Sequence, residues 1–145
     1  MFKIFLKSKK GQATLEFAII GIIVLIIIIL GIQIGIILNS YLAVCHLTRE
    51  GARYAAVNAS KTDSQISSYI LSIKQANLNS SNLSISISPS YSGGSLPSSR
   101  YTGAPISVGI RYNLAGQIFL PTSFFGINIP TTLPTYTVTI RIEKL

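Results

Sequence analysis

Residues 17–38 read FAIIGIIVLIIIILGIQIGIIL, and this stretch decides the architecture of the chain. Gln33 is the only side chain in it that is neither apolar nor a glycine. A helix of this length covers about 33 Å at about 1.5 Å per residue, which is enough to cross the hydrocarbon core of a bilayer. A chain of 145 residues has too little other structure to wrap such a run in a soluble core. We therefore predict a membrane-spanning helix.

The charges on the two sides of this stretch predict its orientation. The four lysines Lys3, Lys7, Lys9 and Lys10 fall in the first ten residues, with no acid among them, whereas the first charged residue after the stretch is Arg49. Positive charge marks the cytoplasmic side of a single span. We therefore predict a single-pass protein of the cytoplasmic membrane, with the N-terminus inside and the C-terminal part outside.

Three kinds of proteolytic processing are possible at this N-terminus. A secretory signal peptide has an apolar region of about 7–15 residues and a small-residue cleavage site, and this run is longer and lacks such a site. A lipoprotein signal ends in a Leu-x-small-Cys box, but LAVC at residues 42–45 has Val44 in the place of the small residue. The third possibility is a cut after Gly11, in the stretch KKGQATLEF of residues 9–17, which leaves the apolar helix on the mature protein.

Glu16 lies at the start of the span and needs a physical explanation. A charged residue at the centre of a membrane helix costs about 2.5–3.5 kcal/mol on insertion scales, and less near the interface. A cut after Gly11 gives Gln12 a free amine, and Gln12 shares a helix face with Glu16, four residues on. That amine, or the amine of a neighbouring subunit, reduces the cost. Alternatively, the negative charge of Glu16 only interacts favourably with the positive N-terminal end of the helix dipole, and Gly11 only breaks the helix.

The order of these features resembles a known processing signal. Gly11, four further residues, Glu16 and Phe17, and then an apolar helix, is the arrangement found in type IV prepilins. Behind the span, residues 49–57 read REGARYAAV. Together these segments are similar to the TadE-like family, which comprises pseudopilins or minor pilins of the tight adherence (Tad, type IVc) pilus system. Residues 135–143 resemble the closing strand of that family.

The resemblance implies a function for individual residues. Gly11 and Gln12 would form the cleavage site of a prepilin peptidase, and Glu16 and Phe17 would serve subunit assembly, with Glu16 meeting the amine of another subunit. The implied partners are prepilin peptidase, the major pilin and other minor pilins, the inner-membrane Tad assembly platform and the membrane. Entry into the fibre, a place at its tip and retention in the membrane all stay open. The alternative is an uncleaved single-span protein whose outer domain scaffolds or binds an envelope partner.

Gly31 and Gly35 form a G-x-x-x-G pattern on one face of the span. Small residues at this spacing let membrane helices approach closely, so we predict a helix-packing site here. Glycine is also common in membrane helices without such a role.

The helix is predicted to continue past the membrane. Small and apolar residues recur at intervals of three and four up to Ala56, which predicts one helical face. Glu50 lies off this stripe, and we predict that it forms a solvated pair with Arg53. The expected organisation is a leader (1–11), a helix with its outward extension (12–57) and an extracytoplasmic domain (58–145).

The extracytoplasmic domain is predicted to be α+β. Thr62 can cap an amphipathic second helix that ends near Asn77. Apolar and polar residues alternate within residues 83–88, 106–113 and 136–143, as in half-buried strands. We therefore expect a small antiparallel sheet of three to four strands, packed on the second helix.

Two loops complete the domain. Residues 89–105 are rich in Ser, Gly and Pro and are predicted to form a mobile loop or a loose hairpin connection. Residues 118–134 keep apolar side chains between prolines, which predicts either an exposed contact patch or a loop tucked over the sheet. The apolar residues concerned are Phe119, Leu120, Phe124, Phe125 and Ile127.

The composition argues against a catalytic site, a metal site and a nucleic-acid surface. The chain has one His, one Cys and one Asp, and no pair of acids lies close in sequence. Cys45 and His46 are adjacent, but zinc requires three or four protein ligands. Despite the net charge of +8, basic residues do not cluster after residue 10, as they would on a nucleic-acid surface. We expect a structural subunit that is not an enzyme, holds no metal or cofactor and binds no nucleic acid.

Overall fold

The computed structural model describes residues 9–119, 123–124, 127–128 and 130–143. The chain forms two compact units, one up to Ile36 and one from Ile37 onward. The boundary lies inside the first helix, α1 (Lys9–Val57), so the end of this helix from Ile37 belongs to the second unit. The prediction that the helix continues past the apolar stretch is therefore confirmed.

The second helix, α2 (Asp63–Ser72), begins where the sequence predicts. The Thr62 hydroxyl accepts a hydrogen bond from the Gln65 backbone N–H (3.3 Å), and the Gln65 side chain accepts one from the Thr62 backbone N–H (3.1 Å). This reciprocal capping box satisfies two amide groups that the first turn of a helix leaves without a partner. Ile66 and Ile70, four residues apart, form the buried face of α2.

The predicted end of α2 near Asn77 is wrong, because the helix ends at Ser72. The chain turns after Ile73, and the Leu78 N–H donates to the Gln75 carbonyl. Leu78 is thereby buried in the core. The burial of this one leucine sets the end of the helix, and a periodicity count along the sequence does not contain that information.

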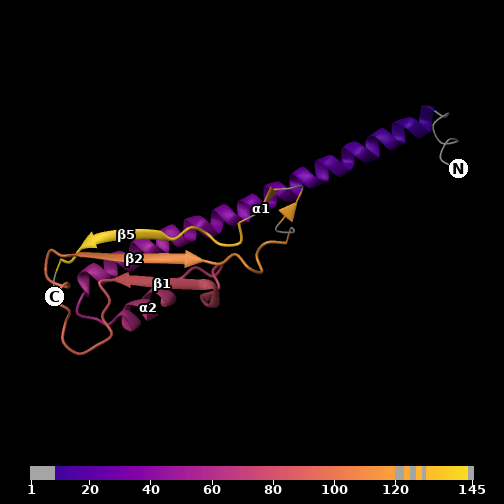
Figure 1. The fold of residues 1–145 in the computed structure, drawn as a ribbon. Helices are drawn as coiled ribbons and strands as arrows, with labels where there is room; N and C mark the ends of the chain where they lie inside the picture. The colour runs from indigo at the N-terminus through magenta and orange to yellow at the C-terminus, as the bar shows by residue number, and fades with distance from the viewer. Residues whose placement is uncertain (1–8, 120–122, 125–126, 129, 144–145) are drawn as a thin grey trace. The chain divides into compact units, whose positions relative to one another are not determined.

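Three antiparallel strands form the sheet of the second unit, in the order β1–β2–β5 (Figure 1). These are β1 (Leu83–Ser88), which follows the short 3-10 turn η2 (Ser80–Asn82), β2 (Pro105–Tyr112) and β5 (Tyr136–Arg141). The three predicted strands are thus confirmed to within two residues at each end. A separate two-stranded ladder, β3 (Ser123–Phe124) and β4 (Ile127–Asn128), was not expected from the sequence.

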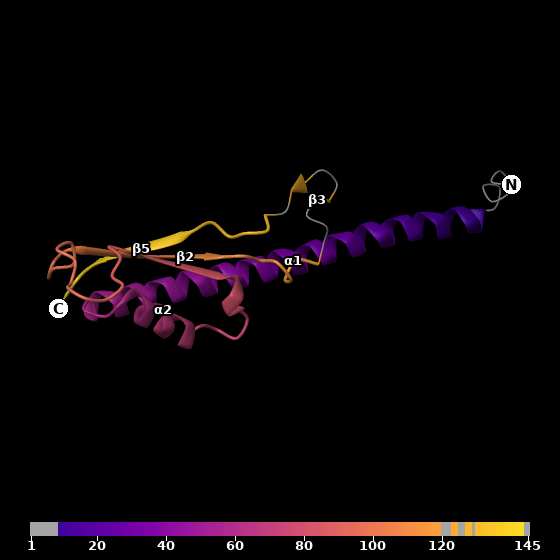
Figure 2. The same ribbon diagram turned by 60° about the horizontal axis from the view of Figure 1, so that its bottom comes forward.

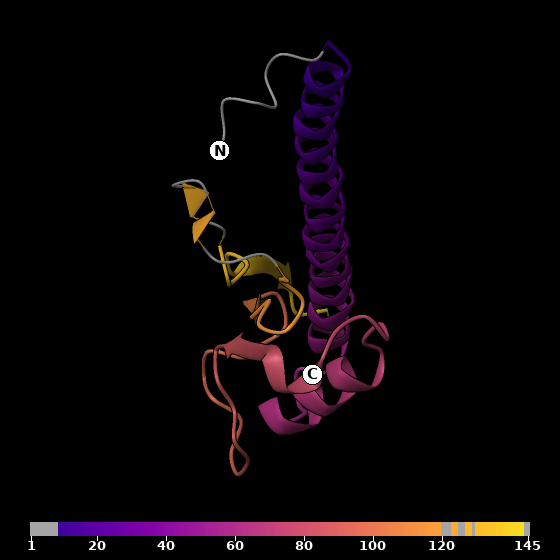
Figure 3. The ribbon, with the colours of Figure 1, turned by 90° about the vertical axis from the view of Figure 1, so that its right-hand side faces the viewer.

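One face of this sheet is covered by helices and the other is open. Figure 2 and Figure 3 show α2 and the part of α1 from Ile37 on the same side of the strands. The side chains of β2 on that side are fully buried, namely Ile106, Val108, Ile110 and Tyr112. The opposite face carries mainly serine and threonine, in agreement with the alternation in the sequence. From the sequence we expected α2 alone to cover this face, whereas α1 covers part of it as well.

The contact between α1 and α2 is close at Gly51, where α1 has small residues on its buried face. Ala52, Ala55 and Ala56 are at most 1% exposed. At Gly51 a methyl group would lie 2.8 Å from both the Cδ1 and the Cγ1 atoms of Ile70, and 3.7 Å from Cγ1 of Val108. A side chain at residue 51 would therefore require the Ile70 side chain, or α2 with it, to shift.

Gly51→Ala is expected to lower the free energy of unfolding of the second unit by about 1–3 kcal/mol, the usual cost of overpacking a core. Gly21→Ala is the matched control, because a methyl group at Gly21 meets no atom within 4 Å and both changes bring the same gain of about 1 kcal/mol in helix propensity. Amide hydrogen exchange of β2 in the detergent-solubilised full chain measures the difference. Equal protection in the two variants would show that the contact is not tight.

Candidate functional site

The predicted processing and assembly residues all lie in the first turns of α1. The helix begins at Lys9 and continues without interruption through Gly11, so Gly11 does not break it. Gln12, Glu16 and Phe17 are exposed, and Phe17 is 78% exposed. Because Gln12 and Glu16 are one helical turn apart, they lie on the same face. The shared face of Gln12 and Glu16 is as the spacing predicts, while cleavage after Gly11 and the functional roles of these residues stay predictions.

Gly31 and Gly35 lie farther along α1, and no packing among the described residues explains them. A methyl group at either residue would meet no heavy atom within 4 Å. The pair is therefore available for another helix, as the G-x-x-x-G pattern predicts, and this role also stays a prediction.

Residues 49–57 have a structural role that their sequence does not reveal. Gly51 and the three alanines of this segment form the surface against which α2 and the sheet pack. Arg49 is exposed, and its guanidinium donates to the Tyr136 hydroxyl at 3.4 Å. That hydrogen bond raises the pKa of Arg49. The segment therefore joins α1 to α2, to the centre of the sheet and to its edge strand β5.

The predicted pair between Glu50 and Arg53 is wrong, because the described side chains of α1 form no ion pair with each other. Both residues instead line a shallow hollow of about 310 Å³ with Tyr54 and Tyr69. The two tyrosine rings stack with their centroids 3.7 Å apart and their planes 11° from parallel. Lys61 donates to the Tyr54 hydroxyl at 2.6 Å. An exposed ion pair contributes little free energy, so the stacked rings, rather than charge, organise this surface.

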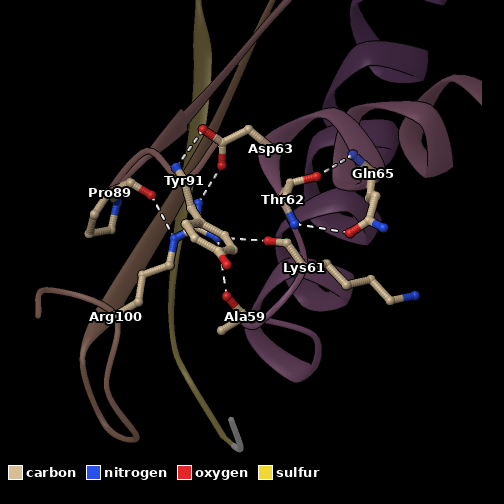
Figure 4. A network of polar contacts seen from close by, with 8 residues as sticks. All are labelled: Ala59, Lys61, Thr62, Asp63, Gln65, Pro89, Tyr91 and Arg100. Atoms are coloured by element: carbon tan, nitrogen blue, oxygen red, sulfur yellow. Dashed lines mark hydrogen bonds and ion pairs between the residues drawn. The ribbon is translucent and has the colours of Figure 1, made fainter. Parts of the chain in front are cut away.

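Arg100 lies at the centre of a polar network that the sequence did not predict (Figure 4). Its side chain is completely buried and forms an ion pair with Asp63, whose side chain is 30% exposed. The remaining guanidinium N–H groups donate to three backbone carbonyls, those of Pro89 (2.8 Å), Lys61 (3.0 Å) and Ala59 (3.2 Å). A planar fork of donors can satisfy so many acceptors at once, whereas a lysine cannot.

The loop from residue 89 to residue 100 is held against the start of α2 by this network. Asp63 accepts a hydrogen bond from the Tyr91 N–H at 2.8 Å, and its own N–H donates to the Tyr91 carbonyl at 2.8 Å. The Arg100 guanidinium also lies over the Tyr91 ring, 5.5 Å from its centroid. The prediction of a mobile loop missed this anchor. The only sequence signal was an isolated arginine in a loop, with the single aspartate of the chain far from it.

Cys45 and His46 lie next to each other on α1 but do not form a site. Cys45 is half-buried and its thiol is reduced, and His46 is exposed. A hydrogen bond with the Cys45 thiol raises the pKa of the Tyr41 hydroxyl. Among the residues that the structure describes, no group of three or more His, Cys, Asp and Glu side chains could hold a metal ion.

The predicted contact patch in residues 118–134 lies largely outside the described part of the chain. Phe119 is 57% exposed. Leu120 and Phe125 are not among the described residues, and of Phe124 and Ile127 the structure gives only the backbone, in β3 and β4. The alternatives of an exposed patch and a tucked loop therefore stay open.

Fold and site together define a class of protein. Within the described residues one helix is long and apolar enough to cross a membrane, with a mean hydropathy of 3.2 over its most apolar window, of which 6% is buried. A two-layer α+β unit begins on that helix and follows it. These features fit a single-pass membrane protein with a folded domain outside the bilayer.

The comparison with protein families is more particular. Residues 11–53 match the family described as TadE-like protein, which confirms the resemblance inferred from the sequence. The matched segment starts at Gly11 and contains the apolar stretch and the block from Arg49 to Arg53. No curated protein and no solved structure matches the chain.

Replacing Arg100 is expected to release the loop. Arg100→Met leaves Asp63 without its cation and three carbonyls without their donor, and we expect a loss of about 3 kcal/mol, the low end for a broken buried pair because Asp63 is partly solvated. Arg100→Lys keeps the charge but not the fork of donors, so it should lose most of this stability as well. Hydrogen exchange at the amides of Asp63 and Tyr91 measures the effect.

Arg111→Met is the control for this experiment. Arg111 is exposed on the open face of the sheet and donates to the Thr135 hydroxyl at 3.0 Å. Its loss should change stability by no more than about 0.5 kcal/mol. If Arg100→Met has an equally small effect, the network is not what holds the loop.

Proposed function

We propose that the chain is a structural subunit of a Tad-type pilus system, a TadE-like minor pilin or pseudopilin that is cut after Gly11 by a prepilin peptidase. The observation that carries the proposal is the extent of the family match, which joins Gly11, the apolar helix and the block after it in one segment. The subunit is anchored in the inner membrane by α1, with its folded unit outside. It contributes to assembly of the pilus through contacts with the major pilin, other minor pilins and the assembly platform.

The continuity of α1 gives the proposed cut a physical consequence. Removal of residues 1–11 leaves a helix that starts at Gln12, with a positive amine added to the positive end of the helix dipole. Glu16 lies one turn away and is exposed, so its carboxylate is available to this amine or to the amine of a neighbouring subunit. Each charged hydrogen bond of this kind contributes about 1.5–3 kcal/mol. Pairing of the Glu16 carboxylate with an amine therefore lowers the free-energy cost of a charge at the edge of the apolar segment.

Replacing Gly11 tests the processing step. In the native host, mass spectrometry of the unmodified protein should find Gln12 as the first residue. Gly11→Leu should retain the leader, because a peptidase must approach the bond closely and a large side chain prevents this. Gly21→Leu should be processed normally, since Gly21 lies away from the proposed cleavage site and a methyl group there meets no atom within 4 Å. An unmodified protein that keeps Met1, or is cut after the span, would indicate the uncleaved scaffold instead.

Replacing Glu16 tests the assembly step separately. Glu16→Gln should be cut normally but lose the charged contact with the amine. A loss of about 1.5 kcal/mol corresponds to about tenfold less subunit co-purifying with the major pilin, since 1.4 kcal/mol is a factor of ten. Thr14→Gln on the same exposed turn is the control for a change of side chain without loss of charge. Undiminished co-purification of the Glu16 variant would contradict the assembly role.

A further inference from the structure

The sheet of the second unit has two outer strands, β1 and β5, and each has a partner strand on one side only among the described residues. Figure 1 shows β2 between them. An outer strand presents backbone N–H and C=O groups that can pair with another chain. Which residues present these groups follows from the register.

On β1 the outward groups belong to the residues of the helix-covered face. The Asn113 N–H donates to the Asn82 carbonyl, so Asn82 points toward β2. Since the direction alternates along an antiparallel strand, Ser84, Ser86 and Ser88 also point toward β2. Leu83, Ile85 and Ile87 therefore direct their backbone groups outward, except that the Leu83 N–H donates to the Ser80 carbonyl.

On β5 the outward groups belong to the residues of the open face. The Ile142 N–H donates to the Ala104 carbonyl, so Ile142 points toward the side of β2. By the same alternation the apolar residues of β5 point toward β2. Thr137, Thr139 and Arg141 therefore direct their backbone groups outward.

The two edges are complementary to each other in one direction only. In a parallel pair, neighbouring residues lie on the same face, and when one directs its backbone groups toward the partner strand the other directs them away. Residues of the covered face direct their backbone groups outward on β1 and toward β2 on β5, so a parallel pair of β1 with β5 fits this rule. An antiparallel pair of β1 with β5 would require both neighbours to point the same way, and it would place an apolar side chain on the open face.

We infer that a second copy of this chain adds to the sheet, with Leu83–Ser88 of one copy paired in parallel with Tyr136–Arg141 of the next. Full overlap of the strands places Ile85 beside Val138 on the covered face and Ser86 beside Thr139 on the open face. The N–H groups of Ile85 and Ile87 then donate to the carbonyls of Thr137 and Thr139. In return, the carbonyls of β1 accept from the amides of β5, as in other parallel pairs.

The chemistry of the strands supports this partner. β1 contains no charged residue and no proline, so it lacks the usual features that protect an edge from pairing. Arg141 of the neighbouring copy would lie beside Ser88, and no like charges meet. The apolar side chains of β1 are only half-buried, unlike those of β2. A further strand at this edge covers them.

The direction of pairing rests on the proposed function. Antiparallel pairing of β1 with a second β1 also obeys the alternation of outward groups. However, the two copies are then related by a two-fold axis, so the parts of α1 from Ile37 onward run in opposite directions in the two copies. Two copies anchored in one membrane with the same orientation cannot be arranged in this way. Parallel addition keeps their helices in one direction and leaves a free edge at each end of the array.

Disulfide crosslinking tests the pairing in the membranes of the native host. Two differently tagged full-length copies, both with Cys45→Ser to remove the free thiol, carry Ser86→Cys and Thr139→Cys respectively. Neighbouring residues of paired strands lie about 4.8 Å apart, within the separation of about 4.4–6.8 Å that a disulfide spans. Mild oxidation should give a mixed dimer. A Ser86→Cys copy with a Ser107→Cys copy is the control and should give none, because Ser107 lies on the central strand.

Each other result overturns the inference in a recognisable way. A mixed dimer of a Ser84→Cys copy with a Ser86→Cys copy would show antiparallel pairing about Ile85, and it would contradict common anchoring and hence the proposed function. Absence of any mixed dimer, in samples whose N-terminus is Gln12, would reject edge pairing and leave the proposed function standing. Crosslinking of the Ser107→Cys control to the same extent would show random collision.

Discussion

The second unit depends on the absence of a side chain at Gly51. At this residue α1 comes so close to α2 that a single methyl group would lie 2.8 Å from two atoms of Ile70. The same contact reaches Val108 in the middle of the sheet. The helix that contains the candidate membrane span thus becomes part of the core of the second unit. The matched family segment ends just beyond this residue, at Arg53, so it includes Gly51.

The end of α1 shows how the rest of the chain is fixed to that helix. The Glu143 N–H donates to the Ala56 carbonyl at 3.1 Å, which attaches the second residue after β5 to the last turn of α1. Arg100 donates to the Ala59 carbonyl just beyond it. A positive guanidinium near the C-terminal end of a helix also interacts favourably with the helix dipole. Segments from three distant parts of the sequence therefore meet at the point where α1 ends.

Local features of this fold could be predicted from the sequence, and long-range ones could not. The alternation of β1 and the Thr62 cap are complete within a few residues, so their prediction needs no tertiary information. The end of α2 depends on where Leu78 finds the core, and the Arg100 network joins residues 37 apart in sequence. The wrong Glu50–Arg53 pair is a different kind of error, because exposed charges at helical spacing are favoured too weakly to fix a geometry.

The candidate processing residues could be identified from the sequence, but the structure adds little about their roles. Gly11 and Glu16 were found from their order and spacing, and the structure adds that the helix is continuous between them. In the proposed function their chemistry depends on a peptidase and on neighbouring subunits, which a single chain does not contain. The block after the span was found as a family signature, and its physical meaning, close packing at Gly51, became visible only with α2 and β2 in place.

Among the described residues the sheet has an odd number of strands, three in a simple antiparallel order. In any such meander an odd count makes the first and last edges run in the same direction, whereas an even count makes them run in opposite directions. Addition of copies by translation therefore creates a parallel contact in an odd sheet and an antiparallel contact in an even one. Gain or loss of a single edge strand in a relative would thus change the hydrogen bonds between translated copies from the slanted parallel pattern to the perpendicular antiparallel pattern.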